Sequence, residues 1–265
     1  MRATWMRGGT SKCWVFTESD LDAAGEDRTE LLVRIFGSPD IRQIDGIGGG
    51  TSTTSKAVLL RPSRRPGVDV DYTFGQVSIT EPTVDWASNC GNCSAVAGLY
   101  ALQAGWVRPS GERTTVTVLN TNTDQLIRQE VPTPRRRVVN AGDNEIAGVP
   151  YPALGVRMGF VKPAGRTTGR LFPTGERRER IDDGAGGLEV TLIDACAPVV
   201  VVDAAALGLG GAEAPTEVDA RPGLLARLER VRAGAARRTA TGPASPPAEV
   251  VTSTRSSSPA ALPRP

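Results

Sequence analysis

The chain has 265 residues, with 31 basic against 29 acidic side chains and a net charge of +2, so it lacks the charge excess typical of proteins that bind nucleic acids or membrane surfaces. An apolar fraction of 39% supports a packed core, and 30 glycines with 20 prolines indicate a fold rich in strands and loops. No segment has the apolar length needed to cross a bilayer, and the N-terminus lacks a signal-peptide core. We therefore expect a cytoplasmic protein with reduced cysteines.

Two features of the composition bear on chemistry. The chain contains no histidine, which excludes Ser-His and Cys-His hydrolytic pairs and histidine-ligated metal sites. It has only three lysines, Lys12, Lys56 and Lys162. Because a lysine amine can titrate and a guanidinium effectively cannot, we treat Lys12 and Lys56 as candidate functional residues. Lys162 lies beside Pro163 in a predicted turn, and we interpret it as a chance lysine.

The N-terminal residues 3–16 predict a strand, a glycine turn and a second strand. The turn combines two glycines, two hydroxyl groups and two cations, and such a loop can clamp a carboxylate. Its candidate binding residues are Arg7, Gly9, Thr10, Ser11 and Lys12. A plain hairpin explains this composition equally well. Residues 20–36 then carry apolar side chains at helical spacing.

A second glycine-rich loop covers residues 46–56. A P-loop places its lysine directly after glycine, whereas Lys56 follows Ser55, and a dinucleotide fingerprint leads into a helix, whereas residues 57–60 are strand-like. Both nucleotide-binding interpretations are therefore weak. We expect this loop to present the hydroxyl groups of Ser52, Thr54 and Ser55, together with Lys56, at the mouth of a strand.

The remaining elements follow from apolar periodicity. Residues 68–79 alternate as a half-buried strand with a glycine bulge near its centre. Residues 90–105 are apolar almost all round and predict a buried central helix. Further strands are predicted at 114–120, 138–139, 146–149, 155–161, 188–194 and 199–202, and a helix at 224–238. The last residues, 239–265, are rich in proline and serine and predict a disordered tail.

The segment Asn89-Cys90-Gly91-Asn92-Cys93 stands at the head of the central helix. Free backbone N–H groups and the helix dipole there favour an anion, which lowers the pKa of a thiol and binds substrate carboxylates. The alternative is that Asn89 only caps the helix and Cys90 is a small core residue. A redox dithiol lacks its usual flanking pattern, and structural zinc would have to recruit the isolated Cys13 and Cys196.

These motifs together resemble the PrpF-type isomerases, a branch of the diaminopimelate epimerase-like fold. The resemblance extends from Thr4 to about Arg238. It rests on seven short segments in the same order, at residues 6–12, 43–49, 54–56, 69–72, 89–92, 173–175 and 192–195. Members of this family move a proton and a double bond in small unsaturated di- or tricarboxylates such as 2-methylaconitate, 4-oxalomesaconate and methylitaconate, without a cofactor or metal.

The resemblance implies an α+β fold of two pseudo-symmetric halves, each a curled sheet around one central helix. It places the first half at residues 1–170, with the central helix at 90–105, and a partial second half at 171–238. Family members continue beyond this point, so we expect an incomplete second half, exposed apolar surface and compensation by a homodimer. Cys13 replaces a common glycine, and Ala197 replaces an asparagine that is usual before the proline of the second half.

The same resemblance assigns roles to individual residues. Lys56 matches the lysine that shuttles the proton, and Cys90 matches the cysteine on the opposite side of the substrate. The substrate carboxylates would be held by Arg7, Gly9, Thr10, Ser11, Lys12, Ser52, Thr54, Ser55, Asn89, Gly91 and Asn92. Two alternatives stay open: an amino-acid epimerase of the same fold that uses Cys90 with Cys196, and an inactive carboxylate-binding pseudoenzyme.

Overall fold

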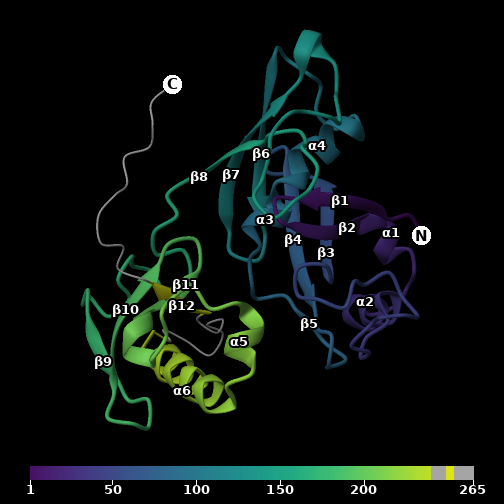
Figure 1. The fold of residues 1–265 in the computed structure, drawn as a ribbon. Helices are drawn as coiled ribbons and strands as arrows, with labels where there is room; N and C mark the ends of the chain where they lie inside the picture. Colours follow the sequence, from purple (N-terminus) through teal and green to yellow (C-terminus); the bar gives the residue numbers. More distant parts are fainter. Residues whose placement is uncertain (240–248, 254–265) are drawn as a thin grey trace. The chain divides into compact units, whose positions relative to one another are not determined.

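A computed structural model describes residues 1–239 and 249–253, and it divides the chain into two compact units, Met1–Lys162 and Pro163–Pro265 (Figure 1). The predicted boundary after residue 170 lies further along the chain. Strands of the first unit are β1 Thr4–Gly8, β2 Ser11–Thr17, β3 Lys56–Pro62, β4 Val70–Val77, β5 Val84–Asp85, β6 Arg113–Asn120, β7 Gln125–Pro132 and β8 Arg157–Phe160. Its helices are α1 Glu18–Asp22, α2 Arg28–Phe36, α3 Gly91–Ser94, α4 Val96–Gln103 and the short 3₁₀ helix Pro134–Arg136.

One mixed sheet forms the first unit, in the order β1-β2-β3-β4-β6-β7-β8, with β5 paired to β4. Neighbouring strands are antiparallel except for the pairs β2/β3 and β4/β6, which are parallel. The α1 and α2 segments connect β2 to β3, and α3 and α4 connect β5 to β6, so the parallel pairs have the crossovers they require. The predicted α+β fold with a sheet around a central helix is confirmed for this unit.

Successive side chains of β3 and β4 point to opposite faces of the sheet, and each face packs against its own hydrophobic cluster. Val58 and Phe74 are cross-strand neighbours, and their face packs in one cluster with residues of α4 such as Ala101. Leu59 points to the other face, where Phe36 of α2 is fully buried against it. Because side chains alternate along a strand, even-numbered residues of β3 and β4 face the central helix and odd-numbered residues face α2.

The central helix is buried because it is apolar on every side, as its sequence predicts. It consists of α3 and α4, joined through Ala95, whose backbone is itself in the right-handed helical region. Gln129 of β7 fastens this helix to the sheet, since its amide accepts from Gly98 N at 2.8 Å and donates to the Ser94 carbonyl at 2.6 Å. Both hydrogen bonds are buried, so each one satisfies a polar atom that would otherwise have no partner.

Three predictions for the first unit are wrong. Gly75 forms no bulge: it pairs regularly with Ala57, and glycine is required because a Cβ there would lie within 3.0 Å of the Trp86 ring. Residues 138–139 and 146–149 are not strands, and the latter contain a turn closed by Val149 N and the Ile146 carbonyl. The strand β7 was not predicted, since its buried positions include Gln125 and Gln129 and so lack the apolar alternation of a strand.

The second unit contains β9 Glu179–Ile181, β10 Leu188–Asp194, β11 Pro198–Asp203 and β12 Glu249–Ser253, with a 3₁₀ helix Ala204–Leu207 and helices α5 Pro215–Asp219 and α6 Pro222–Thr239. Its sheet has the order β12-β11-β10-β9. Val231 and Ala235 of α6 are fully buried in a cluster with Ile181 and Leu192 of this sheet. The predicted strands at 188–194 and 199–202 and the helix at 224–238 are confirmed.

The structure corrects the predicted disordered tail at two places. Thr239 is the last residue of α6, and Glu249–Ser253 forms β12, parallel to β11. The segment contains adjacent valines, Val250 and Val251, which favour a strand, and β11 provides an edge with free backbone groups. Residues 240–248 and 254–265 lie outside the described part of the chain. Among the residues that the structure describes, no helix has the length and apolarity needed to cross a membrane.

Candidate active site

The β1–β2 hairpin meets the first turn of α3. Gly8 and Gly9 make this approach possible, because a Cβ on Gly8 would come within 3.0 Å of the Asn92 carbonyl and a Cβ on Gly9 within 3.0 Å of Asn92 Oδ1. Asn92 Nδ2 donates to Thr10 Oγ1 at 3.0 Å and to Ser11 Oγ at 3.4 Å. The hairpin turn and the helix head, separated by 80 residues in sequence, therefore form one polar surface.

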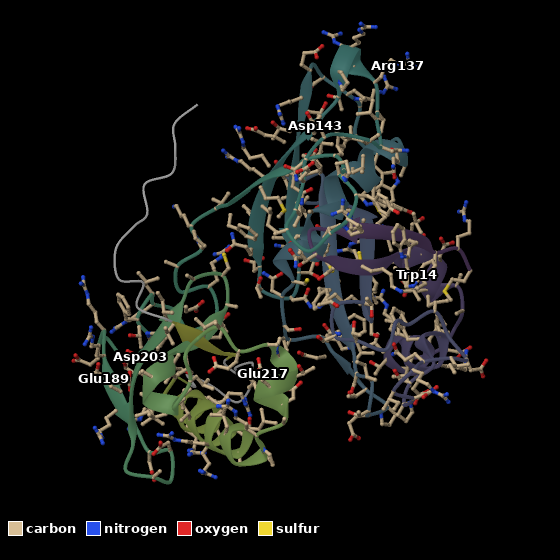
Figure 2. All side chains as sticks on the ribbon, viewed as in Figure 1. Trp14, Arg137, Asp143, Glu189, Asp203 and Glu217 are labelled. Atoms are coloured by element: carbon tan, nitrogen blue, oxygen red, sulfur yellow. The ribbon has the colours of Figure 1, made fainter. Side chains whose placement is uncertain are left out.

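The same hairpin contacts the second glycine-rich loop on its other flank. The backbone N–H of Lys12 donates to the Thr53 carbonyl at 2.9 Å. The Lys12 amine lies over Gly49, where a Cβ would come to 3.0 Å from Nζ and still closer to Thr54 Oγ1. Trp14, labelled in Figure 2, donates its indole N–H to the Ile47 carbonyl at 2.7 Å. Three segments predicted to bind substrate are thus neighbours.

Gln43 organises the glycine-rich loop from within. It is 1% exposed and adopts a positive φ of 48°, and its Oε1 accepts from Gly50 N at 2.9 Å and from the Ser55 hydroxyl. Its amide nitrogen donates to Ser38 Oγ at 3.0 Å. This buried amide fixes Ser55, the residue that precedes Lys56.

Lys56 is the first residue of β3, and only 9% of it is exposed. Its amine donates to Gln76 Oε1 at 2.6 Å and lies 5.1 Å from the centroid of the Phe74 ring. Both partners are on the face of β4 that is directed toward the central helix. An ammonium at this distance from an aromatic face is attracted by the ring quadrupole.

Cys90 lies at the head of the central helix, as the sequence predicts, and it is Cys90 rather than Asn89 that caps α3. Its Sγ accepts from Cys93 N at 3.4 Å, and its carbonyl accepts from Ser94 Oγ at 2.9 Å and from the Tyr72 hydroxyl at 3.4 Å. Tyr72 and Phe74 are alternate residues on one face of β4, so the thiol-bearing turn and the Lys56 amine share this face of the sheet.

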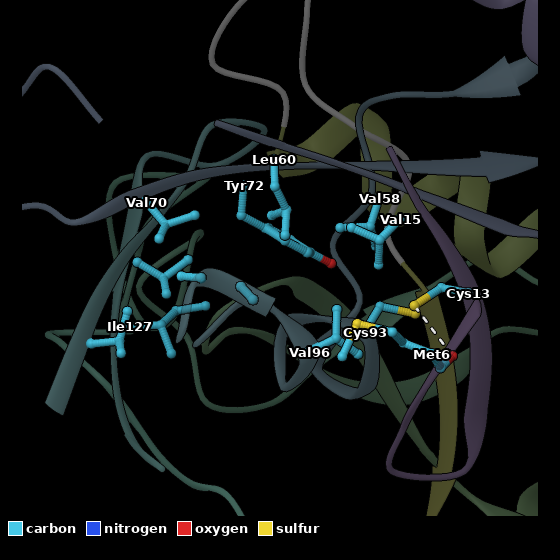
Figure 3. Close-up of a cluster of buried hydrophobic side chains, with 14 of the residues drawn as sticks. Met6, Cys13, Val15, Val58, Leu60, Val70, Tyr72, Cys93, Val96 and Ile127 are labelled. Carbon is cyan, nitrogen blue, oxygen red and sulfur yellow. Dashed lines mark hydrogen bonds between the residues drawn. The ribbon is translucent and has the colours of Figure 1, made fainter. Parts of the chain in front are cut away.

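The thiol chemistry differs from the sequence expectation. A hydrogen bond with the Cys93 thiol and burial raise the pKa of the Cys90 thiol, and the opposing effects of the Lys56 charge and the Cys93 N–H are smaller. The pKa of Cys93 is likewise raised, first by a hydrogen bond with Cys13. Figure 3 shows Cys13 and Cys93 side by side in the core cluster, with Cys13 Sγ 3.7 Å from the Met6 carbonyl. Cys90 is consequently a protonated thiol at neutral pH rather than a thiolate.

The cations of this region are Arg7, Lys12 and Lys56. Within residues 1–239 and 249–253, the ion pairs with carboxylates involve other arginines, and none includes Arg7, Lys12 or Lys56. Arg7 instead donates to the Gly9 carbonyl at 3.0 Å. Cations next to hydroxyl and amide donors favour an anionic ligand such as a carboxylate.

The other predicted binding residues divide into two groups. Gly91 and Asn92 are exposed at the start of α3, and Ser52 and Thr54 lie in the turn before β3. Asn89 is already engaged, because its Oδ1 accepts from Asn120 Nδ2 at 2.6 Å. Asn89 Oδ1 is therefore taken up by a protein partner, which ties the segment before α3 to β6.

Two cavities of the first unit bear on the site. One of about 150 Å³ is bounded by Arg7, Gly9 and Asn92 on its polar side and by Val96 and Leu99 of α4 on its apolar side. A larger hollow of about 710 Å³ lies along β6, β7 and the segment 139–157 and contains none of the predicted site residues. The smaller cavity is the one that adjoins the hairpin turn.

Sequence reasoning missed two glutamines of this region. Gln43 and Gln76 are polar residues at positions where a strand or loop would normally place an apolar side chain. The sequence could have identified Gln76, because side chains alternate along this strand and Gln76 is on the same face as the buried Tyr72 and Phe74. A polar group on the core side of a strand indicates a specific partner, here the Lys56 amine.

Thiols and carboxylates are the remaining groups that could form a metal or redox centre. All four cysteines are free. In the described ranges no three His, Cys, Asp or Glu side chains are grouped so that they could hold a metal ion. Cys196 lies in the second unit at a turn with a positive φ of 79°, where burial and the neighbouring Asp194 raise the pKa of its thiol.

Comparison with known proteins shows what the chain is similar to. A family model described as PrpF protein matches residues 1–261. The chain is 44% identical over 227 residues to 4-oxalomesaconate tautomerase of Pseudomonas putida, which covers 86% of this chain and 62% of the relative. It is 40% identical over 228 residues to 3-methylitaconate isomerase of Eubacterium barkeri, and the match covers 86% of this chain and 60% of the relative. It is also 40% identical over 250 residues to 2-methyl-aconitate isomerase of Shewanella oneidensis, and that match covers 89% of this chain and 63% of the relative.

A solved structure extends the agreement to the fold. The crystal structure of a methylitaconate-delta-isomerase superimposes with a TM-score of 0.69 at 38% sequence identity, covering 92% of this chain and 63% of that one. This similarity confirms the predicted diaminopimelate epimerase-like fold class. The chain spans about three fifths of the length of these relatives.

Proposed function

The chain belongs to the PrpF family, and from this membership and the site geometry we propose that it is an isomerase acting on a small unsaturated di- or tricarboxylate. The candidates are compounds of the 2-methylaconitate, 4-oxalomesaconate and methylitaconate types, after the activities for which its relatives are named. The reaction moves one proton and one double bond and needs no net oxidation or reduction.

The observation that carries this proposal is a set of three cations on neighbouring strands that form no ion pair with a carboxylate among the described residues. Arg7, Lys12 and Lys56 come from β1, β2 and β3. Arg7 and Lys12 flank the hairpin turn, whose Thr10 and Ser11 hydroxyls accept from the Asn92 amide. Such donors neutralise substrate carboxylates and also the charge that develops on a carboxylate when a proton leaves the neighbouring carbon. A monoanionic or neutral substrate would leave most of these charges unpaired.

Two side chains carry out the proposed proton transfer, Lys56 as the base and Cys90 as the acid. Lys56, as a neutral amine, removes a proton from the allylic carbon, and the electron pair forms the new double bond as the old one shifts toward the carboxylate. The dienolate then takes a proton at the former alkene carbon from the Cys90 thiol, which is protonated because its pKa is raised by the Cys93 thiol and by burial. A final transfer from the Lys56 ammonium to the Cys90 thiolate restores both groups.

The test is turnover of a panel of unsaturated acids by the purified chain. Each acid is incubated with the protein, and the positions of its vinyl and methylene protons are followed by ¹H NMR. We expect one or more of the di- or tricarboxylates to isomerise and crotonate, a monocarboxylate with an allylic proton, to remain unchanged. Binding of the di- and tricarboxylates without migration of the double bond would instead identify a carboxylate-binding protein and would contradict the proposed activity.

A further inference from the structure

We propose that Gln76 is a positioning residue for the reaction, and that its side-chain carbonyl holds the Lys56 amine at the site where it exchanges a proton. This inference rests on the proposed function, and it adds a residue that the sequence motifs did not identify. Gln76 acts through Lys56 and touches no other group of the proposed chemistry among the described residues.

The contact follows from strand register. Lys56 and Gln76 are directly opposite each other in the antiparallel pair β3/β4, so their Cβ atoms point to the same face. The bond from Lys56 Nζ to Gln76 Oε1 measures 2.6 Å, at the short end for a hydrogen bond from nitrogen. Since Lys56 is nearly buried, its amine has little access to water as an alternative acceptor.

The orientation of the Gln76 amide is itself fixed. Its Nε2 donates to the Ser55 carbonyl at 3.0 Å, which leaves only the carbonyl oxygen facing Lys56. Ser55 is held in turn by its hydroxyl bond to the buried Gln43. The amine is thus anchored through Gln76 and Ser55 to Gln43, within the glycine-rich loop that also contacts Lys12.

The acceptor that Lys56 contacts is a neutral amide oxygen rather than a carboxylate. A carboxylate at position 76 would form an ion pair and hold the amine as ammonium, whereas a neutral carbonyl accepts a hydrogen bond without adding charge. The titratable groups near the amine are Cys90 and Cys93 of α3, with Cys13 and Tyr72 behind them, and the pKa values of Cys90, Cys93 and Tyr72 are all raised. Cys90, Cys93 and Tyr72 are therefore uncharged at neutral pH. In the described chain, Gln76 is the one side chain with a hydrogen bond to the amine.

The test uses two substitutions that act in opposite directions. Gln76→Leu removes the acceptor and disfavours the ammonium, whereas Gln76→Glu keeps an acceptor and adds a negative charge. Thr73→Val is the control, because Thr73 lies on the same strand but on the opposite face, bonded to Thr121. The readout is a ¹³C NMR titration of lysine side chains, which is simple because the chain has three lysines.

We expect the titration midpoint of the Lys56 amine to fall in Gln76→Leu and to rise by about one pH unit or more in Gln76→Glu, with Lys12 and Lys162 unmoved. In turnover, kcat should fall about tenfold or more in Gln76→Leu with little change in KM, and the acidic limb of the pH profile should move to higher pH in Gln76→Glu. Thr73→Val should leave both readouts unchanged. A purely structural role would lower stability without moving the Lys56 titration.

The outcomes separate this inference from the proposed function. Opposite shifts of the Lys56 signal together with turnover support both. If the Lys56 signal shifts in opposite directions but the wild-type chain shows no turnover, the Lys56–Gln76 contact is supported and the proposed isomerase activity is rejected. Turnover by the wild type with a Lys56 titration that is the same in all variants overturns the role of Gln76. Misfolding of either Gln76 variant is detected by the chemical shifts of Lys12, and the remaining variant then decides.

Discussion

Gly9 and Asn92 touch so closely that no side chain fits between them. A Cβ on Gly9 would lie within 3.0 Å of Asn92 Oδ1, and Gly9 also has a positive φ of 53°, which disfavours other residues. The contact allows Asn92 Nδ2 to reach the hydroxyls of Thr10 and Ser11. The substrate-binding surface that we propose depends on this approach.

Gly9→Ala should therefore separate the hairpin turn from α3. We expect a loss of about 1–3 kcal/mol in the free energy of unfolding and weaker binding of tricarboxylates, measured by urea denaturation and calorimetric titration. Gly111→Ala is the matched control, since the nearest atom to its Cβ would be at an ordinary 3.7 Å. Equal stability and affinity of the two variants would contradict the contact.

Lys56→Met should abolish isomerisation, with kcat/KM at least about a hundredfold lower, because no other amine lies at this position to take the proton. Lys56→Arg should not restore the rate, since a guanidinium effectively never loses its proton. Lys162→Met provides the control, as Lys162 lies in a turn with a φ of 48° after β8. Rates are compared under identical substrate concentrations, and an active Lys56→Met would exclude Lys56 as the base.

Stability should fall at alkaline pH. The pKa of Cys90 is raised first by the Cys93 thiol, that of Cys93 first by Cys13, and that of Tyr72 by burial. Each folded-state pKa exceeds its unfolded value, so the stabilisation is complete below the unfolded pKa, about 8.5 for a thiol, and is lost as pH rises above it. The expected slope is at most about 1.4 kcal/mol per pH unit for each thiol. Urea denaturation between pH 8 and 10 measures it, and a flat profile would refute the prediction.

Stability of the second unit should fall at acidic pH. A backbone hydrogen bond from Ala185 and the ion pair with Arg227 at 2.5 Å lower the pKa of the buried Asp183, and burial opposes them. Because the folded pKa lies below the unfolded value of about 3.9, this stabilisation is present above that pH and is lost below it. Asp183→Asn should reduce the loss of helix and strand signal between pH 4 and 2 relative to Asp182→Asn. Identical acid profiles of the two variants would contradict this assignment.

The sequence predicted those parts of the site that carry local signals. Glycines paired with hydroxyls identified the hairpin turn, and the Asn-Cys-Gly-Asn run identified the head of α3. The strand β7 could not be found in this way, because Gln125 and Gln129 are polar residues whose burial depends on partners elsewhere in the chain. Local patterns describe one element at a time, and these partners belong to other elements.

Cys90 and Gln76 illustrate the same limit for the chemistry. A thiol at a helix start predicts a lowered pKa, but β2 and α3 bring Cys13 and Cys93 together beside it, and the direction is reversed. Gln76 acquires its role from the register of β3 against β4, which pairs it with Lys56. Neither relationship is visible until strands that are distant in sequence are placed next to each other.

The most direct measurement of the central claim is proton exchange into substrate in deuterated water. Unsaturated tricarboxylates are incubated with the wild-type chain and with Lys56→Met, and loss of the allylic ¹H signal is followed by NMR. The account predicts deuterium at the allylic carbon with the wild type and none with Lys56→Met under the same conditions. A folded wild-type chain that binds these acids yet leaves every allylic proton in place would contradict it.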